Sequence, residues 1–280
     1  MIPKFFSRVL LILLGIFFVF SSESFAGSPK KKNSRGYTIS AKAAVLSESN
    51  RGRRLYGKNI HTKILPASTV KVMTALLVLE KLPLDKIITV GKSATYVQPS
   101  KIYAREGERY TVSDLLYAIL MSSANDASIV LAQDVAGSEK EFVRLMNIRA
   151  RQLGARHTLF ANAHGLPTKK GSQYTTAYDM NLIFRQALKH DFFKEALKQP
   201  TKTISSQDGR IIQLKSHNQL LFKSWGRKIF GKTGYTKAAR SCFVGYVQKG
   251  KSTLIVAVFG CVKRWDDIRY IISKYGGIAL

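Results

Sequence analysis

The stretch Pro66-Ala67-Ser68-Thr69-Val70-Lys71 decides how this chain is interpreted, because a serine stands three residues before a lysine where an apolar run begins. Residues 72–79 continue that run, so the pattern predicts a buried helix with Ser68 in its first turn. Residues i and i+3 share one face of a helix, and the Ser68 hydroxyl can therefore meet the Lys71 amine. Because an uncharged amine can activate a serine hydroxyl as a nucleophile, the stretch indicates acyl transfer.

Two triplets further along the chain extend this pattern. They are Ser123-Ala124-Asn125, on a loop between predicted helices at 112–121 and 126–135, and Lys232-Thr233-Gly234, at the start of a predicted strand. A lone Ser-x-x-Lys or Ser-x-Asn arises by chance in a chain of this length, and Lys-Thr-Gly arises less often. The ordered set of three is a much stronger signal than any one member.

Strand-like segments occur near both ends of the chain, around a helical middle. Residues 41–46 and 54–56 predict a hairpin, and strands return after Ile211 before a last helix at 268–275. Capping-box-like helix starts occur at Thr111, Ser138 and Thr176. This order predicts an α+β fold in which one antiparallel sheet, built from both ends, packs on a helical lobe with the site between them.

The three motifs and their flanks resemble the low-molecular-mass penicillin-binding proteins of the D-alanyl-D-alanine carboxypeptidase family, serine peptidase family S11. The flanks that carry the resemblance are Pro66–Ala75, Ser122–Ala127 and Gly231–Thr236, supported by Phe160–Leu166 and Thr175–Met180. It covers about residues 37–275. The resemblance implies a β-lactamase/transpeptidase-like fold, with an antiparallel sheet flanked by helices and a helical lobe.

The resemblance also implies an activity and a set of catalytic residues. The expected protein is a serine D,D-carboxypeptidase that removes the terminal D-Ala of peptidoglycan stem peptides through an acyl-enzyme on Ser68, and that β-lactam antibiotics inhibit. Lys71 would take the serine proton, and Ser123 would pass a proton to the leaving amine. Asn125 would hold Lys71 and the substrate amide.

Substrate binding is implied at the third motif. Lys232 and Thr233 would bind the terminal carboxylate, and Gly234 would let the strand backbone approach the substrate. The backbone N–H groups of Tyr235 and of the nucleophilic serine would form the oxyanion hole. Arg264 resembles a family arginine near the carboxylate pocket, although a surface position is an equal alternative in so basic a chain.

Other functions were weighed against this one. A D,D-endopeptidase that cleaves peptidoglycan cross-links shares all three motifs and stays open. Residues 226–233 satisfy the formal P-loop pattern, but a β-rich segment follows instead of a helix, which leaves a nucleotide-binding protein as a remote alternative. A β-lactamase is disfavoured because no Glu-x-x-Leu-Asn segment is present. An inactive wall-binding module would lack the motif serine or lysines.

The N-terminus predicts export. Residues 1–26 resemble a secretory signal, with Lys4 and Arg8 before an apolar core and Ser24-Phe25-Ala26 as cleavage site; an uncleaved anchor is the alternative. Residues 27–36 are expected to be a basic disordered linker, and residues 37–280 the catalytic domain. We therefore expect the periplasm or cell-wall space, and no membrane attachment through the C-terminus.

The charge of the chain is strongly positive, at +28. Residues 1–26 contribute two basic residues and one acidic residue, so the mature chain carries +28 − 1 = +27. Such a surface attracts polyanions, and for an exported protein we expect anionic wall polymers or a membrane surface as partners, with no nucleic acid. A surface bias without function is an equally weighted alternative.

Neither the cysteines nor the histidines indicate a metal or cofactor site. Cys242 and Cys261 are the two cysteines, and a hairpin centred on residues 249–251 would bring them together as a disulfide or as two buried thiols. The five histidines lack metal-ligand spacing, so no metal and no cofactor is expected. His164 and His217 are expected to be structural.

Overall fold

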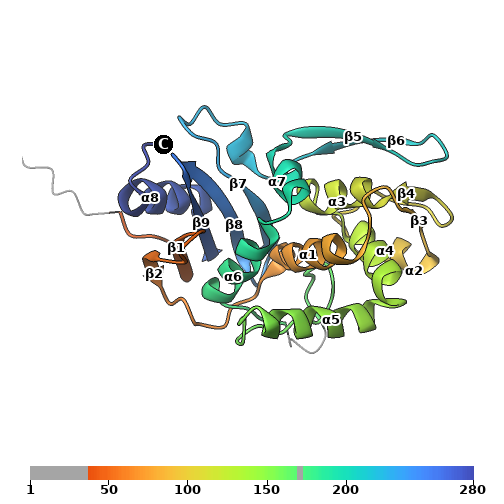
Figure 1. Cartoon of the computed structure of the whole chain (residues 1–280), viewed down its shortest axis with the longest axis horizontal. Coiled ribbons are helices and arrows are strands. Elements are labelled where there is room, and N and C mark those ends of the chain that lie inside the picture. The colour runs from red at the N-terminus through yellow and green to blue at the C-terminus, as the bar shows by residue number, and fades with distance from the viewer. Residues whose placement is uncertain (1–36, 169–172) are drawn as a thin grey trace, which may run out of the picture. The chain divides into compact units, whose positions relative to one another are not determined.

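Strands from both ends of the described chain form one antiparallel sheet. The computed structural model describes residues 37–168 and 173–280, so the predicted signal and linker lie outside the described residues. The strands are β1 (Ala43–Glu48), β2 (Arg54–Lys58), β7 (Phe230–Thr236), β8 (Arg240–Lys249) and β9 (Ser252–Cys261). Their order is β2-β1-β9-β8-β7 (Figure 1). The predicted hairpin and the predicted sheet built from both ends are both confirmed.

Both faces of the sheet are covered. Helix α8 (Arg264–Gly276) packs on one face, and the helical lobe lies on the other (Figure 1). In β9, Val256 and Val258 join the core beneath α8, whereas Ala257 and Phe259 join the core of the lobe. Side chains alternate between the faces of a strand, so burial on both faces requires a continuous apolar run. The segment 254–259 is such a run.

The helical lobe is built around one central helix. Helix α1 (Lys71–Lys81) contacts α3, α4, α5 and α6, and residues 71–78 are all buried. The other helices are α2 (Lys92–Thr95), α3 (Val112–Met121), α4 (Asn125–Ala136), α5 (Glu139–Gln152), α6 (Ala177–Ala187) and α7 (Asp191–Lys198). Two small antiparallel sheets pair β3 (Ile87–Thr89) with β4 (Arg109–Thr111), and β5 (Thr201–Ser205) with β6 (Ile211–Lys215). None of the helices in the described part of the chain is long and apolar enough to cross a bilayer.

The predicted helix starts are confirmed by their capping bonds. The side-chain oxygens of Thr111, Ser138 and Thr176 accept hydrogen bonds from the backbone N–H three residues later, at 3.0–3.1 Å. Each bond satisfies a donor that the first turn of a helix leaves free. At the other end of α4, Gly137 has φ +73°, the left-handed conformation in which glycine pays no steric penalty.

The predicted buried helix with Ser68 in its first turn is confirmed. Its first turn is a 3-10 turn, η1 (Ala67–Val70), which continues directly into α1 at Lys71. Tertiary packing sets this geometry, because β7 and Gly165 press against the turn. The triplet 232–234 lies inside β7 rather than at its start, because pairing with β8 already begins at Phe230.

Two open questions from the sequence are also answered. The P-loop pattern ends within strand β7, so it does not open a helix and cannot form a phosphate cradle. Cys242 and Cys261 are two buried free thiols.

Candidate active site

The predicted nucleophile and base lie side by side. Lys71 Nζ is 3.3 Å from Ser68 Oγ. Ser68 lies in the η1 turn and Lys71 is the first residue of α1, so both side chains are on the same side of the helix. The ammonium group also donates to Asn125 Oδ1 and to the backbone carbonyl of His164, each at 2.6 Å. Lys71 is fully buried, and none of these three contacts is a carboxylate. The amine is therefore fixed in place without a counter-ion.

The surroundings of Lys71 favour its neutral form. Burial, followed by the nearby charge of Lys232, holds the pKa of Lys71 well below its usual range. Asp126 acts weakly in the opposite direction. An amine with a low pKa is unprotonated for more of the time and can accept the serine proton.

Ser123 and Lys232 form a second pair across the cleft. Lys232 Nζ donates to Ser123 Oγ at 3.0 Å and to the backbone carbonyl of Thr233 at 2.9 Å. Ser123 has φ +61°, a strained conformation for a serine, between α3 and α4. Burial and then the charge of Arg264 lower the pKa of fully buried Lys232 to about 7. An anion arriving here would meet a cation that has no carboxylate partner.

Strand β7 approaches the nucleophile as closely as a backbone can. It is the edge strand of the sheet next to β8, and it packs against η1. A Cβ on Gly234 would lie 3.1 Å from both Ser68 N and Pro66 O. Only glycine fits without displacing one of these segments. The next residue, Tyr235, is 68% exposed, and its pairing with Ser241 of β8 fixes the position of its backbone.

Arg264 lies behind this strand. Its Nη1 donates to the carbonyls of Cys242 at 3.0 Å and Gly234 at 3.3 Å, and its guanidinium stacks over the Trp265 ring at 4.1 Å. These contacts tie β7 to β8 next to the third motif. A direct role for Arg264 in binding a carboxylate remains a prediction.

Asn125 and its neighbour Asp126 connect Lys71 to the loop between α2 and β4. Asn125 Nδ2 donates to Gln98 O at 2.7 Å while its Oδ1 accepts from Lys71. The buried Asp126 carboxylate accepts from the N–H groups of Ile102 and Ala104. The sequence interpretation missed Asp126, although its position directly after the Ser-Ala-Asn triplet was a usable signal.

The segment around His164 supplies the other wall. His164 Nδ1 accepts from Leu166 N at 3.2 Å, which confirms the prediction of a turn-packing side chain. Burial and the charge of Lys71 lower the pKa of His164 to about 3. The contact from its carbonyl to Lys71 could not be predicted, because a main-chain oxygen leaves no residue-type signal. Glu139 accepts from Ala163 N at 2.9 Å and was also missed.

The backbone N–H of His217 donates to Met121 O at 3.0 Å, which ties this residue to the end of α3. Partial burial and then the charge of Lys232 lower its pKa to about 4, so the imidazole is neutral. In the described ranges no three His, Cys, Asp or Glu residues are grouped as a metal site would require.

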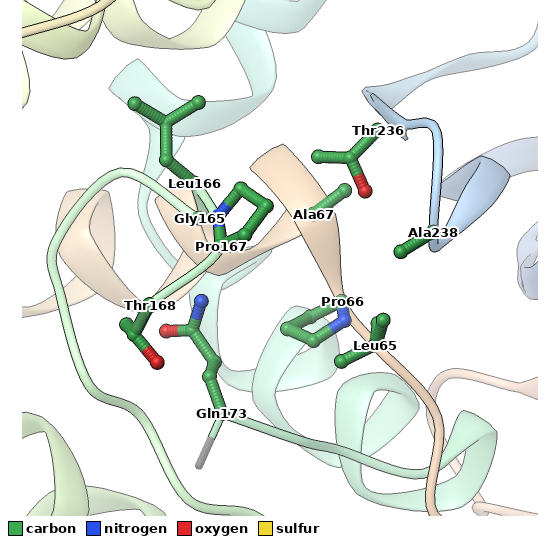
Figure 2. A pocket seen from close by; sticks show the side chains of 10 residues that line it. All are labelled: Leu65, Pro66, Ala67, Gly165, Leu166, Pro167, Thr168, Gln173, Thr236 and Ala238. Atoms are coloured by element: carbon green, nitrogen blue, oxygen red, sulfur yellow. The ribbon is translucent and has the colours of Figure 1, made fainter. Parts of the chain in front are cut away.

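A small apolar pocket of about 200 Å³ adjoins the nucleophile. Figure 2 shows side chains from three segments around it: Leu65, Pro66 and Ala67 before Ser68, Leu166 and Pro167 after His164, and Thr236 at the end of β7. The pocket lies beyond Gly234 in the direction of the strand. It can hold an apolar part of a ligand whose reacting carbonyl is at Ser68.

Most of this chain is similar in sequence to a known protein family. The sequence model of D-alanyl-D-alanine carboxypeptidase, peptidase family S11, matches residues 28–263. The chain belongs to the D-alanyl-D-alanine carboxypeptidase family. The family prediction is thereby confirmed, and in this chain the three motifs contact one another.

Relatives within this carboxypeptidase family differ in their named reactions. D-alanyl-D-alanine carboxypeptidase DacF of Bacillus subtilis is 34% identical over 255 residues, which cover 89% of this chain and 64% of that protein. A D-alanyl-D-alanine endopeptidase of Pseudomonas aeruginosa is 30% identical over 210 residues, covering 74% of this chain and 66% of that protein. The chain thus spans less than two thirds of the length of both.

The fold of this family member also matches solved structures. The Streptomyces K15 DD-transpeptidase superposes with a TM-score of 0.80 at 29% identity, covering 86% of this chain and 99% of that one. The predicted α+β, transpeptidase-like fold is confirmed by this match.

Proposed function

We propose that this protein is an exported serine D,D-carboxypeptidase that removes the terminal D-Ala from peptidoglycan stem peptides. The observation that carries the proposal is the buried Lys71 amine, 3.3 Å from Ser68 Oγ and free of any carboxylate contact. A nucleophile beside a base of lowered pKa is the arrangement that covalent acyl transfer requires. Membership of the carboxypeptidase family supports the substrate class. Export is inferred from the signal-like residues 1–26.

Acylation uses both walls of the cleft. Ser68 Oγ attacks the carbonyl of the penultimate D-Ala while its proton moves to Lys71 Nζ. The developing oxyanion would be held by the N–H groups of Ser68 and Tyr235, because β7 lies against the serine turn. The carbon–nitrogen bond then breaks, and Ser123 passes the proton from Lys71 to the leaving D-Ala amine.

Hydrolysis completes the cycle. Lys71, neutral again, takes a proton from a water molecule that attacks the ester on Ser68. The ester bond breaks, the proton returns to Ser68 Oγ, and the shortened peptide leaves. One water is consumed for each D-Ala released.

Selection of a free C-terminus follows from the sheet wall. Lys232 is buried, its Nζ donates to Ser123 Oγ and to the Thr233 carbonyl, and it has no carboxylate contact in the described part of the chain. A terminal carboxylate would compensate that charge, whereas an amide would leave it uncompensated.

A D,D-endopeptidase is the second candidate, because one relative carries that name. Both activities use the same acyl-enzyme and differ in the leaving amine. Chromatography of products from a linear pentapeptide and from a cross-linked dimer separates them: free D-Ala supports the carboxypeptidase, and release of two monomers supports the endopeptidase.

The decisive experiment traps the acyl-enzyme. Incubation of the mature protein with a β-lactam, followed by intact-mass analysis and peptide mapping, should give one stoichiometric adduct on Ser68, because the ring opens onto the serine and hydrolysis is slow. Ser68→Ala should give none. An adduct at another residue, or no adduct on the folded wild type, would overturn the proposal.

A further inference from the structure

A second, basic pocket adjoins the apolar pocket next to Ser68. It has a volume of about 640 Å³ and shares the lining residues Leu65 and Ala238 with the apolar pocket. Three lysines line it: Lys42, Lys58 and Lys63. Because they share these two residues, the pockets lie next to each other, and a long substrate that reacts at Ser68 can extend along this path.

The three lysines are held without counter-ions. Lys58 Nζ donates to the carbonyl of Ile39 at 3.1 Å, and Lys63 Nζ lies 4.4 Å from the centre of the Tyr174 ring. Over residues 37–168 and 173–280, none of the three forms an ion pair. Lining residue Ser40 does donate to the buried carboxylate of Asp267, whose oxygens are occupied by it and by Tyr37. The positive charge of the pocket is thus largely uncompensated.

The direction of β7 fixes which part of a substrate enters this path. The proposed carboxylate-binding residues Lys232 and Thr233 come first along the strand, Gly234 lies at Ser68, and Thr236 follows at the apolar pocket. The terminal D-Ala is therefore at one end and the acyl side of the peptide runs through the apolar pocket toward the lysines.

The distances are compatible with a stem peptide. Lys63 is five residues from Ser68, which in a fully extended chain spans at most roughly 17 Å. A carboxylate two residues before the reacting D-Ala lies roughly 10 Å upstream. In peptidoglycan that position is a γ-linked D-glutamate whose α-carboxylate is free.

We propose that the pocket formed by Lys42, Lys58 and Lys63 binds the free carboxylate of the stem peptide two residues before the reacting D-Ala. The inference rests on the proposed function and deepens it, because it makes the enzyme sensitive to amidation of that carboxylate. Lysine at the third position of the test peptides removes the side-chain carboxylate of a diaminopimelate as a second source of the same chemistry.

The test compares substrates on matched variants. The substrates are L-Ala-γ-D-Glu-L-Lys-D-Ala-D-Ala, the same peptide with D-isoglutamine in place of D-glutamate, and a blocked L-Lys-D-Ala-D-Ala. The pocket variant combines Lys42→Gln, Lys58→Gln and Lys63→Gln. The control combines Lys92→Gln, Lys189→Gln and Lys251→Gln, which removes three exposed lysines elsewhere. The measurement is kcat/KM by release of D-Ala, with β-lactam labelling of Ser68 as the test of an intact site.

Wild type and control should prefer the glutamate peptide over the isoglutamine peptide by about tenfold, mainly through KM, as expected for a few partly exposed charge contacts. The pocket variant should lose that preference and cleave the blocked tripeptide normally. No preference in the wild type, or a preference that survives in the pocket variant, would overturn the inference. So would an equal loss in both variants, which would indicate a general attraction to anionic wall material. Failure of the wild-type enzyme to cleave even the blocked tripeptide would instead refute the proposed function.

Discussion

Lys71 on the helical wall of the cleft and Lys232 on the sheet wall are both fully buried lysines, yet their surroundings differ. Lys71 Nζ contacts a serine hydroxyl, an asparagine oxygen and a backbone carbonyl that come from three separate segments. Within the described ranges, Lys232 Nζ donates hydrogen bonds to Ser123 Oγ and to the carbonyl of the next residue, Thr233. Lys71 Nζ is therefore held by three contacts next to the proposed nucleophile, whereas Lys232 Nζ has two contacts and can donate a further hydrogen bond to an incoming anion.

The order of the charges explains how one residue type fills two roles. Lys232 lowers the pKa of Lys71, and Arg264 lowers that of Lys232, each in addition to burial. The cation nearest the nucleophile is thus the one most strongly driven to lose its proton. Burial and neighbouring charges thus favour the proposed role of Lys71 as a base and of Lys232 as a binding group for an anion.

The largest difference between the two lysines is expected when each is replaced by arginine. Lys71→Arg should lower the rate of β-lactam acylation about 10³-fold, because arginine stays protonated and cannot act as a base. Lys232→Arg should lose only about tenfold, since a cation still faces the carboxylate. Stopped-flow acylation of both folded variants checks this. Equal losses would contradict the assignment of different roles to the two lysines.

A substitution at Gly234 tests the contact between strand β7 and the η1 turn that carries Ser68. Gly234→Ala would place a methyl group 3.1 Å from Ser68 N and 3.2 Å from Ala67 Cβ, and the displaced strand should reduce acylation about 10²-fold. Gly91→Ala is the matched control, because its Cβ meets only a side-chain oxygen of Gln133 at 3.6 Å. Thermal unfolding measured alongside ensures that both variants are folded. An unimpaired Gly234→Ala enzyme would show that β7 does not position the reacting groups.

The pH dependence of kcat/KM should distinguish the two lysines by the smallest of the three effects. Lys71 must be neutral and Lys232 charged, so kcat/KM should rise with pH as Lys71 loses its proton and fall above about pH 7, by up to tenfold per unit, as Lys232 does. The fall in kcat should come at higher pH, because a bound carboxylate stabilises the Lys232 cation. In Lys232→Arg the alkaline limb should disappear. A retained alkaline limb would assign it to another group.

The sequence alone determined the local features of this protein and the identity of its motif residues. Capping side chains at Thr111, Ser138 and Thr176 act within one helical turn, and the β1–β2 and β8–β9 hairpins depend on neighbouring segments, so these features could be predicted. The three motifs indicated the proposed nucleophile and the two lysines because each proposed role needs a particular side chain.

The arrangement of the motif residues in space could be seen only in the tertiary structure. The 3-10 turn at Ser68 depends on Gly165 and Gly234 pressing against it from distant segments, and the lock on Lys71 includes a main-chain carbonyl 93 positions away. The joined apolar and basic pockets likewise combine segments before Ser68, after His164 and after β7. Such approaches follow from packing between segments far apart in the chain, and backbone oxygens and shared cavities leave no signature in residue types.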